Sequence, residues 1–299
     1  MFVALVVVMF ALQPVGMELR QLGLTLQTAM PLVLVSAAQC IVLLTAGMDA
    51  SVGGVLAVTN VLTAVWTGGL EGTASWRIIV IVILGGAMGA INGTLVVFVK
   101  VPPFIATIAT WSIYDGLALL MLRSAGGATP TSLTEFITSP LAGIPMSILI
   151  LASVLVAWWW WRGTASFKAI ISLGSDDIRA ALSGVRVGRA TFTAYTLSGF
   201  IAGLAGIYLA LVTSTGDPTI GDEYLLPSIE AALIGGVSLA GGMGGIGQAV
   251  AGALMLTCIG GIISELSLPS WVAIVASAGL LLLVIGLRSR IESKAVNPV

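Results

Sequence analysis

Long apolar segments, separated by short polar breaks, run along the whole chain. Each is close to the roughly 17–25 residues that a helix needs to cross a bilayer, and the alternating polarity of an outer-membrane β-strand is missing from the sequence. The pattern predicts helices over residues 1–16, 24–46, 50–69, 77–99, 103–122, 143–161, 189–212, 226–243, 246–265 and 269–287. We therefore expect an all-α integral membrane protein of about ten transmembrane helices, folded as a single domain over residues 1–299.

The amino-acid composition excludes a water-soluble domain. Hydrophobic residues make up 58% of the chain and charged residues only 8%, whereas charged residues are about a quarter of a soluble domain. Histidine is missing, and the two cysteines, Cys40 and Cys258, fall in apolar segments, so neither a disulfide framework nor a metal site is expected. The sequence has no stripe of basic residues that would indicate nucleic-acid binding. We expect no catalytic residue, metal or cofactor. We expect the helices to be surrounded by the lipid bilayer.

The positions of lysine and arginine predict the orientation of the chain. If both termini lie in the cytoplasm, nine of the 12 basic residues fall inside and three outside, which is the bias typical of membrane proteins. The inside group is Lys100, Arg162, Lys168, Arg179, Arg186, Arg189, Arg288, Arg290 and Lys294, and the outside group is Arg20, Arg77 and Arg123. The first apolar segment begins at Met1 without the basic leader of a cleaved signal peptide.

Two further patterns predict how helices are anchored and packed. Four consecutive tryptophans at 158–161, followed by Arg162, are typical of a helix end at the headgroup level, with ligand stacking as the alternative. Glycines spaced four apart place small residues on one helix face, so that helix backbones can approach closely. These sets are Gly85, Gly89 and Gly93, then Gly199 and Gly203, then Gly241 and Gly245.

Polar residues within apolar segments are the candidates for a translocation pathway, because such groups are costly in a membrane. They are Asp49, Asn60, Asn92, Asp115, Glu230 and Gln248, together with Trp111, which shares a helix face with Asp115. Structural alternatives remain open. Asp49 could cap the helix that follows it, Asn92 could hydrogen-bond to a neighbouring helix, and Asp115 could make a buried structural hydrogen bond.

Residues 24–122 and 189–287 are candidate inverted repeats. Asp49 precedes Gly53-Gly54, and Glu230 precedes Gly235-Gly236, each in the second segment of a four-helix group. The spacing of the two groups gives them opposite topologies, and paired glycine-interrupted segments in inverted repeats often mark a transport path. Coincidence is the alternative explanation of this weak similarity.

The loop over residues 162–188 contains a short predicted helix at 175–184. Ser175 is a suitable N-cap, the two aspartates after it suit the helix dipole, and Gly184 is placed to end the helix. Ile178 and Leu182 give it one apolar face. Since so short a helix is not stable alone, we expect it to dock on the membrane surface or the protein's own loops, or in a groove of a cytoplasmic partner. The candidate docking residues are Ser175, Asp176, Asp177, Ile178, Arg179, Ala181, Leu182, Ser183 and Gly184.

Several stretches, in order along the chain, resemble the ribose/xylose/arabinose-type ABC sugar permeases. Residues 47–53 (G-M-D-A-S-V-G) resemble the family's G-I-D-L-S-V-G motif, departing at Met48 and Ala50. Residues 101–107 (V-P-P-F-I-A-T) with 116–118 (G-L-A), and residues 180–185 (A-A-L-S-G-V), match two further motifs. Residues 234–244 (I-G-G-V-S-L-A-G-G-M-G) resemble I-G-G-x-S-L-x-G-G-R-G, with Met243 where arginine is usual. No single motif is decisive, but the ordered set, from residue 24 onward, is specific.

The resemblance implies an ABC importer permease architecture in the bacterial inner membrane. In that family the cytoplasmic loop carries the coupling helix that fits into the ATPase subunit, and this implies the same role for residues 175–184. The implied partners are a cytoplasmic dimer of ATP-binding cassette ATPases, a periplasmic sugar-binding protein, and a second permease, either an identical copy or a different one. The sequence has no G-x-x-x-x-G-K-[ST] phosphate loop, so we expect a transport subunit and not an enzyme.

The expected function is ATP-driven import, by alternating access, of a simple sugar such as a ribose-like pentose. The small number of charges at membrane depth favours a neutral polyol over an ionic solute. One alternative is the related branched-chain amino acid permease, against which the Asp49 and Pro102-Pro103 motifs argue. The other is an ion-driven secondary transporter, which would use Asp115 and Glu230 as ion sites.

Overall fold

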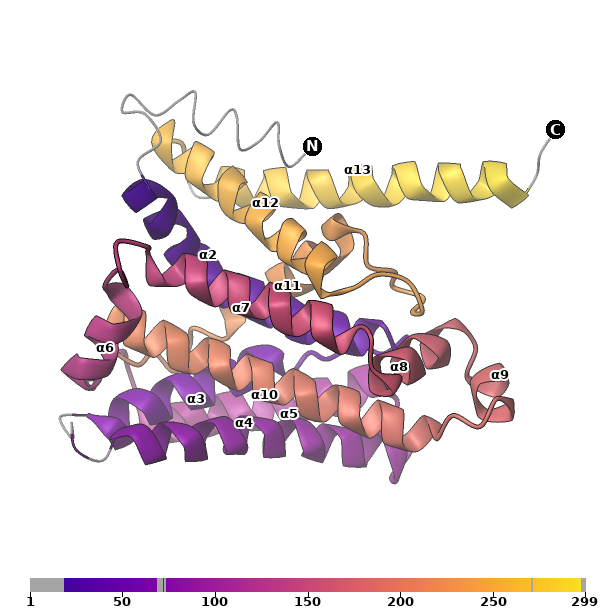
Figure 1. Cartoon of the computed structure of the whole chain (residues 1–299), viewed down its shortest axis with the longest axis horizontal. Coiled ribbons are helices and arrows are strands. Elements are labelled where there is room, and N and C mark those ends of the chain that lie inside the picture. The colour runs from indigo at the N-terminus through magenta and orange to yellow at the C-terminus, as the bar shows by residue number, and fades with distance from the viewer. Residues whose placement is uncertain (1–18, 69–71, 73, 270, 297–299) are drawn as a thin grey trace.

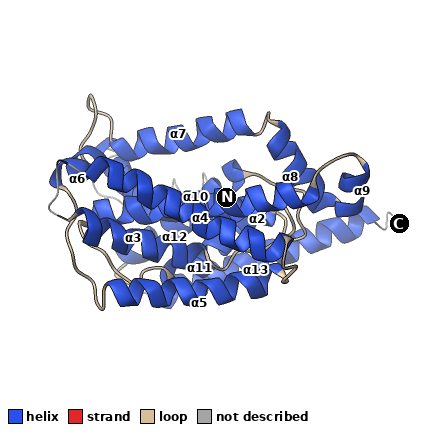
Figure 2. Cartoon of the chain, turned by 90° about the horizontal axis from the view of Figure 1, so that it is seen from below, coloured by secondary structure: helices blue, strands red, loops and turns tan. Residues whose placement is uncertain are grey.

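The computed structural model describes residues 19–68, 72, 74–269 and 271–296, and within these residues it contains helices and no β-strand (Figures 1 and 2). The all-α class is therefore confirmed for this part of the chain, and the predicted helix at 1–16 lies outside it. The helices are α2 (Leu19–Leu43), α3 (Val52–Thr67), α4 (Ala74–Val97), α5 (Pro103–Met121), α6 (Thr131–Thr138), α7 (Met146–Trp161), α8 (Ala165–Ser175), α9 (Asp177–Leu182), α10 (Val187–Thr213), α11 (Asp222–Gly235), α12 (Ile246–Glu265) and α13 (Trp271–Val296).

Five of these helices, α2, α4, α5, α10 and α12, are long and apolar enough to cross a membrane. α7 and α8 together make a sixth candidate span, bent by 78°. α3 and the segment Trp271–Val284 of α13 are apolar but shorter. The described residues thus hold five or six candidate spans, and the expected count of about ten is not confirmed.

α10 forms the centre of the bundle. It packs against α2, α3 and α4, and its Tyr195, Ala202 and Ala205 are fully buried. α5 lies against α3, while α11 and α12 pack on each other and on α2. Figure 1 shows α13 on the far side of α11 and α12 from the layer of α3, α4 and α5.

The contact between α4 and α10 confirms the close packing predicted from the glycine spacing. A Cβ on Gly199 would lie 2.7 Å from Cα of Gly89, and a Cβ on Gly85 would lie 3.0 Å from Cα of Gly203. Because such distances are too short for real Cβ atoms, only glycine lets the two backbones touch along this stripe. The third glycine set is not on a helix, because Gly241 and Gly245 lie between α11 and α12.

The helix pattern differs from the prediction at one boundary and in two additional helices. The helix expected at 226–243 is α11, which ends where Gly236 adopts a left-handed φ of 105°. The following turn keeps Gly241, Gly242 and Gly244 at positive φ, a backbone that glycine adopts at little cost. The loop 162–188 holds α8 as well as α9, because Phe167, Ile170 and Leu173 give α8 a buried face. α6 falls in a stretch where the sequence pattern predicts no helix.

α2 and α10 run antiparallel. The Tyr208 hydroxyl donates to the Gln27 carbonyl at 3.4 Å, and the Tyr195 hydroxyl donates to the Met48 carbonyl at 3.4 Å. The start of each helix therefore faces the end of the other, and each is followed by a short helix, α3 with 16 residues or α11 with 14. Opposite directions are what inverted repeats require, and the repeat itself stays a prediction.

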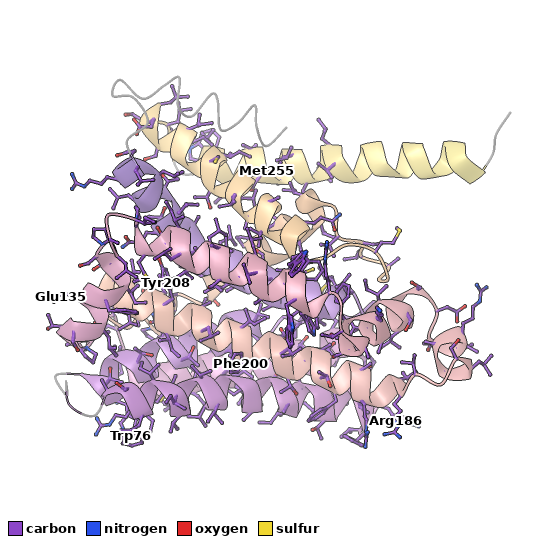
Figure 3. All side chains as sticks on the ribbon, viewed as in Figure 1. Trp76, Glu135, Arg186, Phe200, Tyr208 and Met255 are labelled. Atoms are coloured by element: carbon purple, nitrogen blue, oxygen red, sulfur yellow. The ribbon has the colours of Figure 1, made fainter. Side chains whose placement is uncertain are left out.

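The two ends of the bundle carry different numbers of basic residues. Figure 3 places Trp76 and Glu135 at one end and Arg186 at the other. At the first end the Arg77 guanidinium lies 5.4 Å from the Trp76 ring centroid and donates to the Trp66 carbonyl. At the second end are α8, α9 and the start of α10 (Figure 1), with Arg162, Lys168, Arg179, Arg186 and Arg189. Arg77 of the predicted outside group and these five residues of the inside group therefore lie at opposite ends of the bundle, and the orientation in the membrane stays a prediction.

Candidate transport pathway and docking helix

A buried network of hydrogen bonds surrounds Asp49, in the turn between α2 and α3. Asp49 is 1% exposed, and its Oδ1 accepts both the Ser51 backbone N–H at 3.0 Å and the Ser51 hydroxyl at 2.6 Å. Its Oδ2 accepts the hydroxyl of Ser198, on α10, at 2.9 Å. The predicted capping role is close to what is observed, but the bond goes to the N-cap residue Ser51 and not to an amide inside α3. The carboxylate fastens this turn to α10.

Asn92 extends the network from α4 to α5. Its Nδ2 donates to the Ser51 hydroxyl oxygen at 2.6 Å, and its Oδ1 accepts the Thr110 hydroxyl at 2.7 Å. Asn92, Ser51 and Thr110 are all buried. The alternative that Asn92 hydrogen-bonds to a neighbouring helix is confirmed. Two of the predicted pathway residues, Asp49 and Asn92, are thus joined through Ser51.

Ser51, Thr110 and Ser198 are members of this network that sequence reasoning missed. Serine and threonine hydroxyls in a helix commonly bond to the carbonyl one turn back, and Thr110 also does so, to Ala106 at 3.2 Å. Residue type therefore did not distinguish these three hydroxyls from the others. Only Ser51 carried a signal, because it belongs to the motif at residues 47–53.

Replacing Asp49 with alanine is expected to destabilise the bundle. The change removes the three hydrogen bonds to the Asp49 carboxyl group, each worth about 0.5–1.5 kcal/mol, and leaves the buried Ser198 hydroxyl without its acceptor. A loss of about 3 kcal/mol lowers Tm by about 6–12 °C for a domain of this size. Thermal unfolding in detergent measures the effect. Ser198→Ala, which removes one bond and leaves the other two, is the control, and a larger fall in Tm for that variant would contradict the network.

Asn60 is buried on α3 but does not belong to this network. Its Nδ2 donates to the Gly206 carbonyl at 3.3 Å, and its Oδ1 accepts the backbone N–H of Asp217 at 2.7 Å. Both ends of the amide are therefore engaged with α10 and with the segment that follows it. This geometry assigns Asn60 a fastening role between α3 and α10.

Trp111 and Asp115 are half-buried on α5. The Trp111 ring packs against Gly54 of α3, where a Cβ would lie 3.3 Å from its Cδ1. Within the described part of the chain, the buried Trp111 Nε1–H has no hydrogen-bond partner. Asp115 lies near enough to Asp222, at the start of α11, for their charges to interact. Trp111 and Asp115 thus place an indole N–H and a carboxyl group on one face of α5.

Glu230 and Gln248 lie apart from these groups. Glu230 lines a groove of about 470 Å³ between α2, α11, α12 and α13, together with Glu223, Thr28 and Thr257. Gln248 is exposed in the first turn of α12. The predicted pathway set is therefore divided: Asp49 and Asn92 share one network, Trp111 and Asp115 share α5, and the remaining residues are separate.

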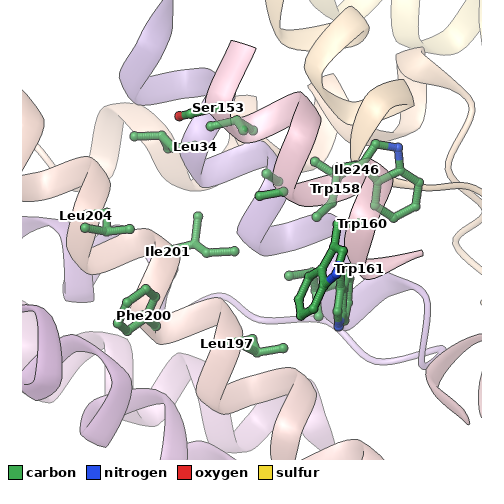
Figure 4. A pocket seen from close by; sticks show the side chains of 14 residues that line it. Leu34, Ser153, Trp158, Trp160, Trp161, Leu197, Phe200, Ile201, Leu204 and Ile246 are labelled. Carbon is green, nitrogen blue, oxygen red and sulfur yellow. The ribbon is translucent and has the colours of Figure 1, made fainter. Parts of the chain in front are cut away.

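The tryptophan run lines an apolar cavity of about 380 Å³ between α2, α7 and α10 (Figure 4). Trp158 and Trp161 pack edge-to-face on Phe167 of α8, with ring centroids 4.9 and 5.1 Å apart. The Ser153 hydroxyl in the lining bonds to the Ile150 carbonyl of its own helix at 2.7 Å. A lining of this kind suits lipid tails better than a sugar, which favours the membrane-anchor interpretation of the tryptophans.

α9 presents its apolar side chains to solvent. Ile178 is 69% exposed and Leu182 is 83% exposed. These side chains lie one turn apart on α9 and contribute to no buried core of the described bundle. The predicted apolar face is present, and among the residues that the structure describes these two side chains stay largely uncovered.

The ends of α9 are fixed by local hydrogen bonds. The N-cap is Asp176, whose carboxylate accepts the Arg179 N–H at 2.9 Å. The predicted N-cap, Ser175, is instead the last residue of α8, so that prediction is wrong by one residue. Gly184 ends the helix as predicted, at φ 85°, and its N–H bonds to the Ala181 carbonyl at 3.0 Å.

The chain is similar to several known import permeases. The ribose import permease protein RbsC of Escherichia coli (strain K12) is 31% identical over 290 residues, which cover 94% of this chain and 89% of that protein. The fructose import permease protein FrcC of Rhizobium meliloti is 33% identical over 236 residues, 75% of this chain and 65% of that protein. The autoinducer 2 import system permease protein LsrC of Enterobacter sp. (strain 638) is 31% identical over 276 residues, 90% and 78% of the two chains. No solved structure matches the chain.

A protein-family model extends this similarity across nearly the whole bundle. The family is described as the branched-chain amino acid transport system / permease component, and its model matches residues 22–287. The match covers every described helix except the first residues of α2 and the last residues of α13. The resemblance to ABC sugar permeases noted in the sequence is thereby confirmed, and this chain belongs to the family of branched-chain amino acid transport system permease components.

Proposed function

We propose that this protein is the membrane-spanning permease subunit of an ATP-binding cassette importer that carries a simple sugar, such as a ribose-like pentose, across the bacterial inner membrane by alternating access. The observation that carries the proposal is the similarity to a ribose import permease over 94% of the chain. Other relatives are named as permeases for fructose, D-allose and autoinducer 2. Transport is then the work of this subunit, and ATP hydrolysis that of a partner.

The polar groups of the bundle support a neutral solute. Asp49 already accepts three hydrogen bonds, so it is a poor site for a coupling ion or a charged substrate. Trp111 and Asp115 supply an aromatic surface, a free N–H donor and an acceptor, which together match a sugar ring and its hydroxyls. We place the solute pathway along this face of α5.

The α8–α9 end is the cytoplasmic end in this proposal, and both termini lie on the same side. The larger group of basic residues lies there, as the positive-inside rule requires. The apolar face of α9, Ile178 and Leu182, is the part that docks in a groove of the ATPase. Since ATP-binding cassette ATPases act as a dimer, a second permease, identical or different, completes the pore. A periplasmic sugar-binding protein delivers solute to the opposite end of the bundle.

Two other functions are weighed against this one. The family description names branched-chain amino acid transport, but the relatives above are named for sugars and autoinducer 2, so that solute is not favoured. An ion-driven transporter would need Asp115 and Glu230 as ion sites. Glu230 lines the groove toward α12 and α13, and Asp115 is not among the residues that line it, so the two carboxylates do not form one site.

Reconstitution in liposomes tests the function. The chain is combined with its ATPase and solute-binding protein, and uptake of labelled ribose is followed with and without ATP on the ATPase side. We expect uptake only with ATP. Uptake that ignores ATP and follows a proton or sodium gradient would establish the ion-driven alternative and exclude the importer.

Replacing Trp111 with alanine, or Asp115 with asparagine, is expected to slow sugar uptake about tenfold each. Losing one stacking or charged hydrogen-bond contact costs about 1.4 kcal/mol, which corresponds to that factor. Initial uptake rates in the same liposomes measure it. Leu120→Ala is the control, because Leu120 is 82% exposed on the same helix and contributes no polar group. Uptake unchanged in both variants would remove this face of α5 from the pathway.

A further inference from the structure

At the α8–α9 end, helix α8, the turn after α2 and the turn between α11 and α12 meet backbone to backbone, with glycines at the contacts. The Gly242 N–H donates to the Leu44 carbonyl at 3.1 Å, which ties the α11–α12 turn to the end of α2. A Cβ on Gly174 of α8 would lie 2.5 Å from the Gly242 nitrogen and closer still to the Leu44 oxygen. A Cβ on Gly241 would lie 2.6 Å from the Ala46 nitrogen and 2.8 Å from the Gly174 oxygen. Gly174, Gly241 and Gly242 form what we call the glycine joint.

The three glycines are required for different reasons. Gly241 and Gly242 have φ values of 83° and 69°, so side chains there are strained as well as crowded. Gly174 lies inside α8 with helical backbone. Alanine at Gly174 therefore fits the local backbone well, and its cost comes only from separating α8 from the two turns. That makes Gly174 the position at which the joint can be altered alone.

On one side of the joint is the docking helix. α8 ends at Ser175, and Asp176 caps α9 directly after it. The buried Phe167, Ile170 and Leu173 hold α8 against the bundle. α8 and α9 thus follow one another without a flexible linker, and a displacement of α9 reaches Gly174 within two residues of the cap.

On the other side are the helices of the proposed pathway. The turn that begins at Leu44 leads to Met48, whose carbonyl accepts hydroxyls from Thr107 of α5 at 3.3 Å and from Tyr195 of α10 at 3.4 Å. The next residue, Asp49, binds Ser198. The turn that holds Gly241 and Gly242 connects α11 to α12. Both turns therefore lead from the joint into the bundle, one to α5 and α10, the other to α11 and α12.

We propose that the glycine joint transmits the movement of α9 to these four helices, with Gly174, Gly241 and Gly242 as positioning residues for coupled transport. This rests on the proposed function, because it needs an ATPase that moves α9. The joint couples α8 to the two turns by close contact. Three backbones without intervening side chains leave no room for one of these segments to move independently of the others. Widening the joint uncouples ATP hydrolysis from uptake without touching the docking surface.

The first test is Gly174→Ala, with Gly163→Ala as the matched control. Gly163 lies in the same loop, and a Cβ there would meet only the Trp160 carbonyl at 3.4 Å. In liposomes, Gly174→Ala is expected to keep ATPase binding and hydrolysis while the number of sugars moved per ATP falls at least tenfold, and Gly163→Ala is expected to match the wild type. An unchanged ratio, or loss of ATPase binding, overturns the proposal. If the wild type itself shows no ATP-dependent uptake, it is the proposed function that fails.

A second measurement applies even if Gly174→Ala does not fold. Cysteines introduced by Lys168→Cys, Met243→Cys and Glu135→Cys, all at exposed positions, are spin-labelled in pairs; the native Cys40 and Cys258 are buried. With ATP, the distances from 168 and from 243 to the reference at 135 are expected to change, while the distance between 168 and 243 stays fixed. A distance between 168 and 243 that changes with ATP, or distances to 135 that stay fixed, overturns the joint.

Discussion

Leu182→Asp is expected to abolish ATP-driven uptake and to leave the helical bundle intact. Leu182 is 83% exposed at the end of α9, so the change costs the isolated chain little, as most surface substitutions do. In the proposed complex the same side chain enters an apolar groove of the ATPase, where an unpaired carboxylate costs several kcal/mol. About 4 kcal/mol corresponds to roughly a thousandfold weaker ATPase binding, which is enough to separate the subunits at working concentrations.

Three measurements on the same preparation check this expectation. ATPase retained on permease liposomes reports docking, uptake of labelled sugar reports coupling, and Tm reports folding. Ser166→Asp is the matched control, because it adds the same charge at an exposed position of the neighbouring helix α8, outside the candidate docking residues. It should keep most of the binding. Normal uptake by Leu182→Asp would exclude docking of α9 in the ATPase. It would support docking on the membrane surface, the alternative that the sequence leaves open.

The docking helix shows how far local sequence signals reach. Gly184 ends α9 as predicted because the left-handed conformation is a property of one residue. The N-terminus was wrong by one residue, since Ser175 and Asp176 are both good N-caps. The choice between them depends on how far α8 extends, and α8 continues to Ser175 because its buried face packs on the bundle. That packing is a tertiary effect, which a cap signal does not contain.

The Asp49 network shows the opposite limit. The polar candidates Asp49 and Asn92 were predictable, since a polar group in an apolar segment stands out. Their partners were not, because Ser198 is 149 residues from Asp49 and Asn92 is 41 residues from Ser51. The sequence also predicted a helix at 226–243, because the segment is largely apolar. The turn in this segment depends on tertiary contacts, of Gly241 with Ala46 and of Gly242 with Ser175.

Replacing Gly199 with leucine is expected to prevent the bundle from folding. A single Cβ at this position would already lie 2.7 Å from Cα of Gly89, so leucine must force α10 away from α4. α10 is the central helix, and its displacement also breaks the bond from the adjacent Ser198 to Asp49. Size-exclusion chromatography in detergent should show no monodisperse peak. Gly279→Leu, where a Cβ meets no atom within 4 Å, makes the same change on α13 and should give a normal peak. A monodisperse Gly199→Leu protein with wild-type Tm would mean that the glycine stripe does not hold α4 and α10 together.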